Sequence, residues 1–164
     1  MSQEPRPGIL RETTPEAIQQ ARRIIRSARF AALAALDPET GHPLASRVGL
    51  ACLDDGTPFT VISALASHTG ALRADPRCSL LVGETGKGDP LAYARLTLVC
   101  TARFLDPGST EAAEARARYL AAQPKATLYI ELPDFRFVRF DIGRASFNAG
   151  FGKAYALEGA ELIG

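Results

Sequence analysis

The feature that most constrains the fold is a series of short apolar runs, each bounded by residues that form turns. Runs of strand length occupy residues 30–36, 44–53, 58–63, 78–83, 91–105 and 135–148. An Asp-Pro-Glu-Thr-Gly turn follows the first run, and an Asp-Asp-Gly turn separates the second run from the third. Strands joined by such turns pair as antiparallel hairpins, so the second and third runs are predicted to form one.

Three helices are predicted among these strands. Thr14-Pro15 starts the first, residues 67–75 form a short second, and residues 109–122 form an alanine-rich third. The glycine motifs of dinucleotide-binding and phosphate-loop domains are absent, which argues against both of those folds. We therefore expect a mainly β fold with helices (α+β), an antiparallel barrel with the helices packed around it.

Size and composition indicate one ordinary globular domain. The chain has 164 residues, predicted as a flexible leader over residues 1–13 and a single domain over residues 14–164. Nineteen basic and eighteen acidic side chains give a net charge of +1, and tryptophan is absent, which argues against a nucleic-acid partner. No apolar run is long enough for a membrane helix and the N-terminus lacks a signal-peptide core, so we expect a cytoplasmic protein with no membrane partner.

The cysteines give no indication of a metal site. Cys52, Cys78 and Cys100 lie far apart, no CxxC pair occurs, and only His42 and His68 are available to add ligands. Each cysteine lies in an apolar stretch of strand character. We therefore expect small buried side chains and no bound metal.

The segment from Val61 to Gly70 has the residues of an anion site. An apolar strand ends at Ser63, and a helix begins a few residues later, where unpaired amides and the helix dipole can hold a phosphate. Ser67 and Thr69 add hydroxyl groups there, and His68 adds an imidazole. The alternative is that Ser67 serves only as the N-cap of its own helix.

Two strand arginines are further candidates for binding. Arg47 interrupts a face of small residues, which leaves room for a planar ligand whose anionic group the guanidinium can bind. Arg95 lies in a similar position beside Thr97. The alternative for both arginines is a solvent-exposed strand surface. No Gly-x-Ser-x-Gly elbow and no pair of carboxylates indicates hydrolytic chemistry, so no catalytic residue is predicted.

At these residues the sequence resembles the FMN-binding split-barrel family, the pyridoxamine 5′-phosphate oxidase-like proteins. The run from Ser63 to Val82 contains a His-Thr pair followed by Leu-x-x-Asp-Pro-Arg-x-Ser-Leu-Leu, which is similar to the haem-utilisation branch of that family. The segment from Phe147 to Ala154 resembles the Gly-Phe-Gly-basic-Ala tail of the same branch. The similarity extends over roughly residues 27–157.

The resemblance implies a six-stranded antiparallel split barrel, an FMN cofactor and a homodimer with its flavin sites at the subunit interface. The cofactor-binding residues that it implies are Arg47, Val48, Ser63, Ser67, His68, Thr69, Arg95 and Thr97. Arg47 would contact the FMN phosphate or ribityl chain, and the serines, His68 and Thr69 would surround the phosphate. Arg95 and Thr97 would reach the flavin of the partner subunit.

The sequence also departs from parts of the family pattern. His68 and Thr69 replace an Arg-Lys pair of the oxidases, and the tryptophan-bearing substrate motif is absent, so pyridoxamine phosphate oxidase activity is not expected. Haem-degrading relatives carry a tail histidine and a further C-terminal domain, whereas no histidine follows His68 here. The leading hypothesis is an FMN-dependent oxidoreductase acting on a small molecule. The alternatives are a haem-binding or haem-degrading protein and a non-catalytic flavin carrier or sensor.

Overall fold

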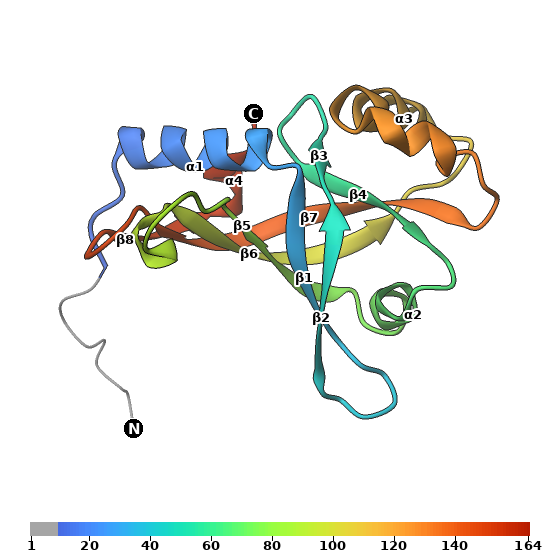
Figure 1. The fold of residues 1–164 in the computed structure, drawn as a ribbon, viewed down its shortest axis with the longest axis horizontal. Helices are drawn as coiled ribbons and strands as arrows, with labels where there is room; N and C mark the ends of the chain where they lie inside the picture. The colour runs from blue at the N-terminus through green and yellow to red at the C-terminus, as the bar shows by residue number, and fades with distance from the viewer. Residues whose placement is uncertain (1–9) are drawn as a thin grey trace.

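The computed structural model describes residues 10–164, which form a curled antiparallel sheet with helices around it (Figure 1). Residues 1–9 of the predicted leader lie outside the described residues. Leu10 forms an isolated bridge with Ala154, and the Arg11 amide donates to the Ala154 carbonyl at 2.9 Å. The described end of the leader therefore pairs with residues close to the C-terminal end of the chain.

All the strands of residues 10–164 belong to one eight-stranded sheet. They are β1 (Phe30–Leu36), β2 (Pro43–Gly49), β3 (Ala51–Cys52), β4 (Pro58–Ser63), β5 (Arg77–Val82), β6 (Arg95–Phe104), β7 (Phe135–Asn148) and β8 (Ala154–Glu158). The order in the sheet is β2-β1-β5-β6-β7-β4-β3, and β8 pairs with the end of β7 that β4 leaves free. β2 also lies against β4, although no ladder joins them, and this contact curls the sheet toward a barrel.

The predicted α+β class with an antiparallel barrel is confirmed, but the strand count is eight instead of six. The predicted strand over residues 44–53 divides at Leu50, whose amide donates to the Arg29 carbonyl at 2.9 Å. The part before Leu50 pairs with β1, and only Ala51 and Cys52 pair with β4. The predicted hairpin between the second and third runs is therefore limited to β3 and β4. The other additional strand is β8, in the segment predicted as a tail.

The helices are α1 (Pro15–Ser27), α2 (Ser67–Ala74), α3 (Thr110–Ala122) and α4 (Gly159–Leu162), with short 3₁₀ turns η1 (Pro90–Ala92) and η2 (Pro124–Leu128). The predicted N-cap of α1 is confirmed, because the Thr14 hydroxyl accepts from the Ala17 amide at 3.2 Å. Ser109 caps α3 in the same way, at 3.1 Å from the Ala112 amide.

Within residues 10–164, no helix has both the length and the apolar character needed to cross a membrane.

Two groups of buried side chains fix this arrangement. The larger fills the curled sheet and the space beneath α1, and its largest fully buried side chains include Leu33, Leu98, Phe140 and Phe147. The smaller lies beneath α3 and is built on Phe59. Cys78 and Cys100 belong to the larger group as free thiols, as predicted, whereas Cys52 is only half-buried.

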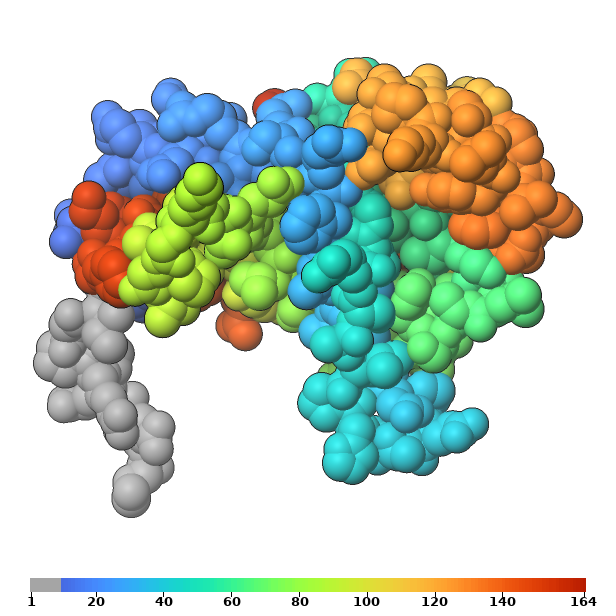
Figure 2. All heavy atoms as spheres, in the orientation of Figure 1, coloured from blue at the N-terminus to red at the C-terminus, as the bar shows by residue number. Residues whose placement is uncertain are grey.

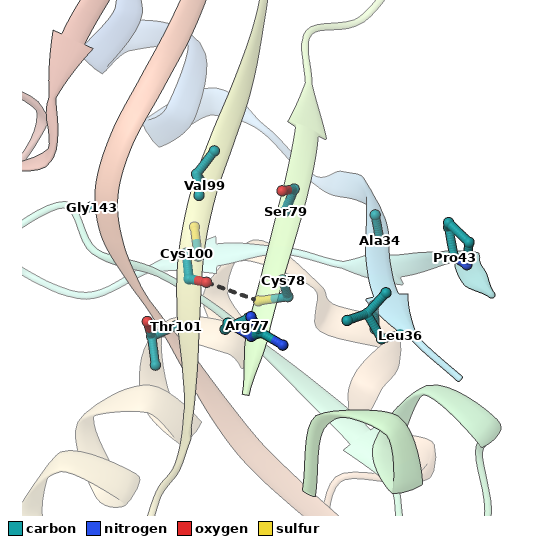
Figure 3. A pocket seen from close by; sticks show the side chains of 11 residues that line it. Ala34, Leu36, Pro43, Arg77, Cys78, Ser79, Val99, Cys100, Thr101 and Gly143 are labelled. Carbon is teal, nitrogen blue, oxygen red and sulfur yellow. Dashed lines mark hydrogen bonds between the residues drawn. The ribbon is translucent and has the colours of Figure 1, made fainter. Parts of the chain in front are cut away.

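The convex side of β1, β5 and β6 is exposed, and we call it the outer sheet face. It presents alternate side chains of these strands, including Phe30, Leu81 and Val99, which are 43%, 49% and 38% exposed. A shallow hollow of about 400 Å³ lies on it, bounded by Leu36 and Pro43 among others (Figure 3). The hairpin between β1 and β2 projects from the body of the molecule beside this face (Figure 2).

Candidate functional site

A pocket of about 370 Å³ opens where β2 and β4 meet α2, α3 and η2, and we call it the Arg47 pocket. Its lining residues are Arg47, Val48, Gly49, Val61, Ile62, Ser63, Ala66, His68, Tyr119, Tyr129 and Phe135. Arg47, Val48, Ser63 and His68 were among the predicted binding residues. The fold brings these four together because β2 lies against β4, and α2 follows β4 directly.

Arg47 provides the positive charge of the pocket. It is an exposed residue of β2, and its guanidinium carbon lies 5.5 Å from the ring centroid of Phe30. Among residues 10–164 no carboxylate forms an ion pair with it. An arginine without a carboxylate partner at a pocket is available to bind an anionic ligand.

The N-terminus of α2 provides hydrogen-bond donors. Its N-cap is Ala66, which offers no side-chain cap, so the alternative that Ser67 is the N-cap is wrong. In the described part of the chain, no protein atom accepts a hydrogen bond from the amides of Ser67 or His68. Free amides at a helix N-terminus attract an anion, and here they lie beside a pocket that already contains an arginine.

His68 does not act as a fixed cation in this structure. Its side chain is half-buried, and burial lowers the pKa of the imidazole below its usual value of 6.5. The ring is therefore neutral near pH 7, able to donate one hydrogen bond and accept another.

Ser63 and Thr69 form hydrogen bonds within the protein. The Ser63 hydroxyl donates to Oδ2 of Asp134 at 2.6 Å and accepts from the Leu65 amide at 3.1 Å. Thr69 is buried, and its hydroxyl donates to the Ser63 carbonyl at 2.6 Å. Both hydroxyls hold the turn between β4 and α2, and neither is directed freely into the pocket.

Aromatic side chains form the opposite wall of the pocket. Tyr129 and Phe135 pack with their ring centroids 5.1 Å apart, and Tyr119 comes from α3. The pKa of Tyr119 is raised, first by burial and then by the neighbouring Tyr129, so its phenol stays protonated. Gly49 permits this wall, because a Cβ at that position would overlap the Tyr119 hydroxyl.

Arg95 and Thr97 lie outside the Arg47 pocket of their own chain. The Arg95 guanidinium donates to the carbonyls of Leu91 and Tyr93 at 3.1 and 3.2 Å. Thr97 is exposed on β6, and the strand register places Arg47, Ala32, Leu81 and Thr97 in one row across the outer sheet face. Thr97 thus shares a face with Arg47, at a distance of three strands.

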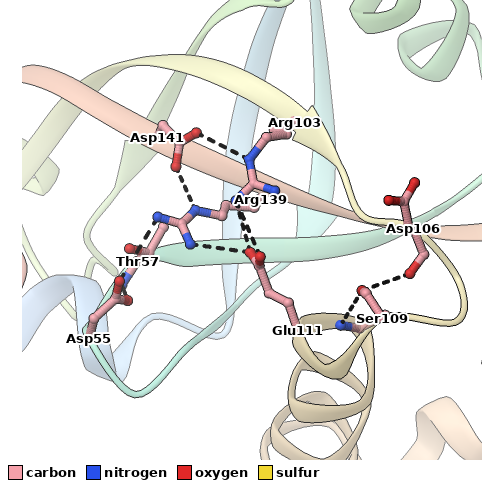
Figure 4. A network of polar contacts seen from close by, with 9 residues as sticks. Asp55, Thr57, Arg103, Asp106, Ser109, Glu111, Arg139 and Asp141 are labelled. Carbon is pink, nitrogen blue, oxygen red and sulfur yellow. Dashed lines mark hydrogen bonds and ion pairs between the residues drawn. The ribbon is translucent and has the colours of Figure 1, made fainter.

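A network of charged side chains attaches α3 to the sheet (Figure 4). Glu111, in the first turn of α3, accepts from Arg103 at 3.0 Å and from Arg139 at 3.1 Å. Arg139 also donates to Asp141 at 2.5 Å. Because α3 carries Tyr119 and precedes Tyr129, this network supports the aromatic wall of the pocket.

The groups that line the pocket are suited to binding a ligand. It offers one guanidinium, free amides and an aromatic wall, which together suit a planar ligand with an anionic group. The Ser63 hydroxyl is hydrogen-bonded to Asp134 and not to His68, so these two residues do not form a nucleophile–base pair in the pocket.

The predicted binding residues did not include the aromatic wall of Tyr119, Tyr129 and Phe135, nor Asp134, which contacts the lining residue Ser63. The tyrosines lie on or beside a helix recognised only as alanine-rich, and Asp134 is separated from Ser63 by 71 positions. A tyrosine among alanines in the helix at 109–122 was the one available local signal, since it is the only large side chain that helix buries.

Two proteins similar to this chain have names that refer to haem. A non-canonical haem oxygenase of Arabidopsis thaliana, the chloroplastic protein HOZ, is 33% identical over 115 residues, which are 70% of this chain and 34% of that protein. A haem-binding protein of Mycobacterium smegmatis superposes with a TM-score of 0.83 at 34% identity, covering 92% of this chain and 61% of the other. The chain thus spans about a third of the length of the plant protein.

A protein of unknown function from Agrobacterium tumefaciens has the same fold, with a TM-score of 0.82 and 35% identity over 98% of this chain and 66% of the other. The family profile described as pyridoxamine 5′-phosphate oxidase matches residues 17–149, a stretch that includes β1 to β7 and every lining residue of the Arg47 pocket. The chain therefore belongs to the pyridoxamine 5′-phosphate oxidase family.

Proposed function

We propose that this chain binds FMN in the Arg47 pocket and supports redox chemistry on a small molecule. The observation that carries the proposal is that the unpaired guanidinium of Arg47 and the free amides at the start of α2 meet at one pocket. A phosphate is the anion that such a pair recognises best. Flavin binding is characteristic of the family, so FMN is the phosphorylated planar ligand to test first.

The residues present fit such a cofactor in distinct ways. Arg47 would hold the phosphate or the ribityl chain, and the amides of Ser67 and His68 would donate to phosphate oxygens. Tyr129 and Phe135 would offer an apolar wall to the ring system. When bound, the flavin itself supplies the electron transfer, and the protein binds, orients and shields it.

We also propose that the cofactor site is completed by a second copy of the chain on the outer sheet face. Exposed apolar side chains such as Phe30 and Leu81 are typical of a surface that another protein covers. Thr97 and Arg47 lie in one row on that face, so a copy docked there brings Thr97 of one subunit toward the site of the other. Sedimentation of the full chain should give a dimer, and Leu81→Glu should shift it to monomer; a monomeric wild type would contradict this arrangement.

The FMN proposal is tested by titrating the purified chain with FMN and following flavin fluorescence and the visible spectrum. We expect quenching and shifted flavin bands at micromolar FMN. Arg47→Ala should weaken binding by about 1.5–3 kcal/mol, since it removes a charge-assisted contact to phosphate. Arg23→Ala, an exposed α1 arginine distant from the pocket lining, is the matched control and should bind as the wild type does.

Unshifted flavin bands at micromolar FMN would refute the proposal, as would equal affinity of the Arg47→Ala and Arg23→Ala variants. Turnover of reduced nicotinamide or oxygen by the FMN-loaded protein separates an oxidoreductase from a carrier. Binding without such turnover would indicate the carrier or sensor.

Haem binding is the second candidate, and the names of the relatives at 33% and 34% identity favour it. One observation of the pocket agrees, because the pKa of His68 is lowered and a neutral imidazole is the form that ligates iron. Addition of haem should then produce a shifted Soret band that His68→Ala abolishes. Equal haem uptake by wild type and variant would exclude His68 as a ligand.

A further inference from the structure

Asp134 holds a carboxylate against the turn between β4 and α2. Its Oδ2 accepts the Ser63 hydroxyl proton at 2.6 Å, and its backbone carbonyl accepts the Ala64 amide at 2.7 Å. The position of the carboxylate is therefore fixed by a side-chain contact and a main-chain contact. Ser63 itself lines the Arg47 pocket, so this negative charge lies one hydrogen bond away from the pocket wall.

Charges of both signs lie near the pocket. Arg136, two positions after Asp134, directs its guanidinium to the carbonyls of Pro133 and Phe135 at 2.6 and 2.8 Å and not to the Asp134 carboxylate. Arg47 contributes one positive charge, and His68 is neutral near pH 7 because burial lowers its pKa. No ion pair neutralises Asp134 among the residues that the structure describes. A phosphate dianion entering beside Ser63 would meet attraction from Arg47 and repulsion from Asp134.

We infer that Asp134 is a specificity-determining residue of the Arg47 pocket, whose carboxylate limits the preference of the site for a phosphorylated ligand over the same ligand without phosphate. This inference rests on the proposed function, since FMN is the phosphorylated ligand concerned. It goes beyond that function by assigning the level of phosphate selectivity to one residue outside the pocket lining.

Two effects of the contact act in the same direction. The carboxylate repels a second anion, and at half-buried positions such repulsion is only partly screened by water. The contact also directs the Ser63 proton toward Asp134, so that Ser63 cannot donate it to a phosphate oxygen without breaking a charge-assisted hydrogen bond. The repulsion disappears when the carboxylate is replaced by a neutral group, and the hydrogen bond from Ser63 becomes an ordinary neutral one.

Asp134→Asn isolates the charge from the hydrogen bond. An asparagine side chain retains a carbonyl oxygen that can accept from Ser63, so the turn keeps its contact while the negative charge is lost. Asp134→Ser is a second neutral variant with a short hydrogen-bonding side chain. Glu131→Gln is the matched control, because Glu131 lies in the same loop as Asp134 but its carboxylate pairs with Arg116 and not with Ser63.

The experiment compares the affinities of FMN and riboflavin for the full-length wild type and these variants, with melting temperatures measured alongside. Asp134→Asn should bind FMN about tenfold more tightly, which corresponds to about 1.4 kcal/mol. Riboflavin affinity should stay within about twofold, since riboflavin carries no charge to be repelled. Glu131→Gln should change neither affinity.

The outcomes separate this inference from the proposed function. If the wild type binds FMN and the folded Asp134 variants leave the ratio of FMN to riboflavin affinity unchanged, the inference fails and the function stands. If the wild type binds no flavin but Asp134→Asn binds FMN, the inference holds and the wild type is not a flavoprotein. If neither protein binds FMN, both statements fail. If neither Asp134 variant folds, Asp134 is a structural residue of the turn, and the inference fails.

Discussion

The contact between Gly49 and Tyr119 provides a direct test of how the pocket is built. Gly49 lies on β2 and lacks a positive φ, so alanine can adopt its backbone conformation. A Cβ built there would overlap the Tyr119 hydroxyl and lie 3.3 Å from Cζ of the same ring. Tyr119 is 2% exposed and packs on Phe59 with ring centroids 6.0 Å apart, so it cannot swing into solvent without leaving the core.

The expected cost follows from these distances. Gly49→Ala should reduce the free energy of unfolding by about 1–3 kcal/mol, the usual penalty for overpacking a close-packed site. Tyr119→Phe removes a buried hydroxyl and should cost about 1 kcal/mol. In the double variant the overlapping oxygen is gone and only Cζ remains near, so we expect a favourable coupling of about 1–2 kcal/mol.

The assay is urea unfolding of the four proteins of this double-mutant cycle, followed by circular dichroism under identical conditions. The result expected is a double variant distinctly more stable than the sum of the two single costs predicts. Additive costs, or a Gly49→Ala variant as stable as the wild type, would refute the close approach of Tyr119 to β2 and with it the aromatic wall of the pocket.

Three further predictions concern pH, salt and thiol chemistry. The pKa of His68 in the folded protein is below its unfolded value, so protonation favours unfolding. The stability that His68 contributes is therefore complete above about pH 6.5 and is lost as the pH falls. His68→Gln should accordingly make the melting temperature vary less between pH 8 and pH 5 than it does in the wild type. An equally steep fall in both proteins would contradict this. Glu111→Gln should lower the free energy of unfolding by about 1 kcal/mol at low salt and by less in 1 M NaCl, as measured by urea titration; a cost that salt leaves unchanged would argue against an ionic origin. Burial raises the pKa of Cys78 to about 12 and also raises that of Cys100. A disulfide-exchange reagent at pH 8 should therefore modify neither thiol until urea unfolds the protein. Rapid labelling of both thiols in the native protein would contradict this and show that the strands open.

Local patterns were sufficient for the strands whose apolar runs have sharp limits. Residues 30–36, 58–63 and 135–148 were predicted with the bounds that β1, β4 and β7 have in the structure. Each run ends where a turn residue or a change of composition makes extended pairing unfavourable, so the limit is encoded in neighbouring residues. The N-cap of α1 at Thr14 is predictable for the same reason.

Features that depend on distant partners could not be predicted from local patterns. The division at Leu50 arises because β2 pairs with β1 while β3 pairs with β4, and no local residue marks that exchange of partners. β8 is a short strand that forms along the free edge of β7, and its segment carries no strand period of its own. The 3₁₀ turn that begins at Pro90 delays β6 until Arg95, four positions later than predicted.

The candidate site likewise contains residues that local patterns predict and residues that only distant packing adds. Arg47, Ser63 and His68 were identified because a strand, a turn and a helix start are local signals, and the Arg47 pocket contains all three. Tyr119 and Tyr129 join them from a helix and a 3₁₀ turn more than fifty positions later in the sequence, through packing that only the folded sheet creates. Asp134 was the hardest residue to predict, because its side chain is linked to the pocket through Ser63, which lies 71 positions away in the sequence.

The strand arginines illustrate why the formal charge of the whole chain says little about the site. Arg47 and Arg139 both interrupt apolar strands, and the sequence alone does not distinguish them. The register places Arg139 beside Arg103, where carboxylates of Glu111 and Asp141 bind both guanidinium groups. The same register places Arg47 opposite Ala32, among side chains that bring no carboxylate within ion-pair distance in the described part of the chain. A net charge of +1 is therefore compatible with a cation that has no carboxylate partner, and the pairing of the strands determines that Arg139 is paired and Arg47 is not.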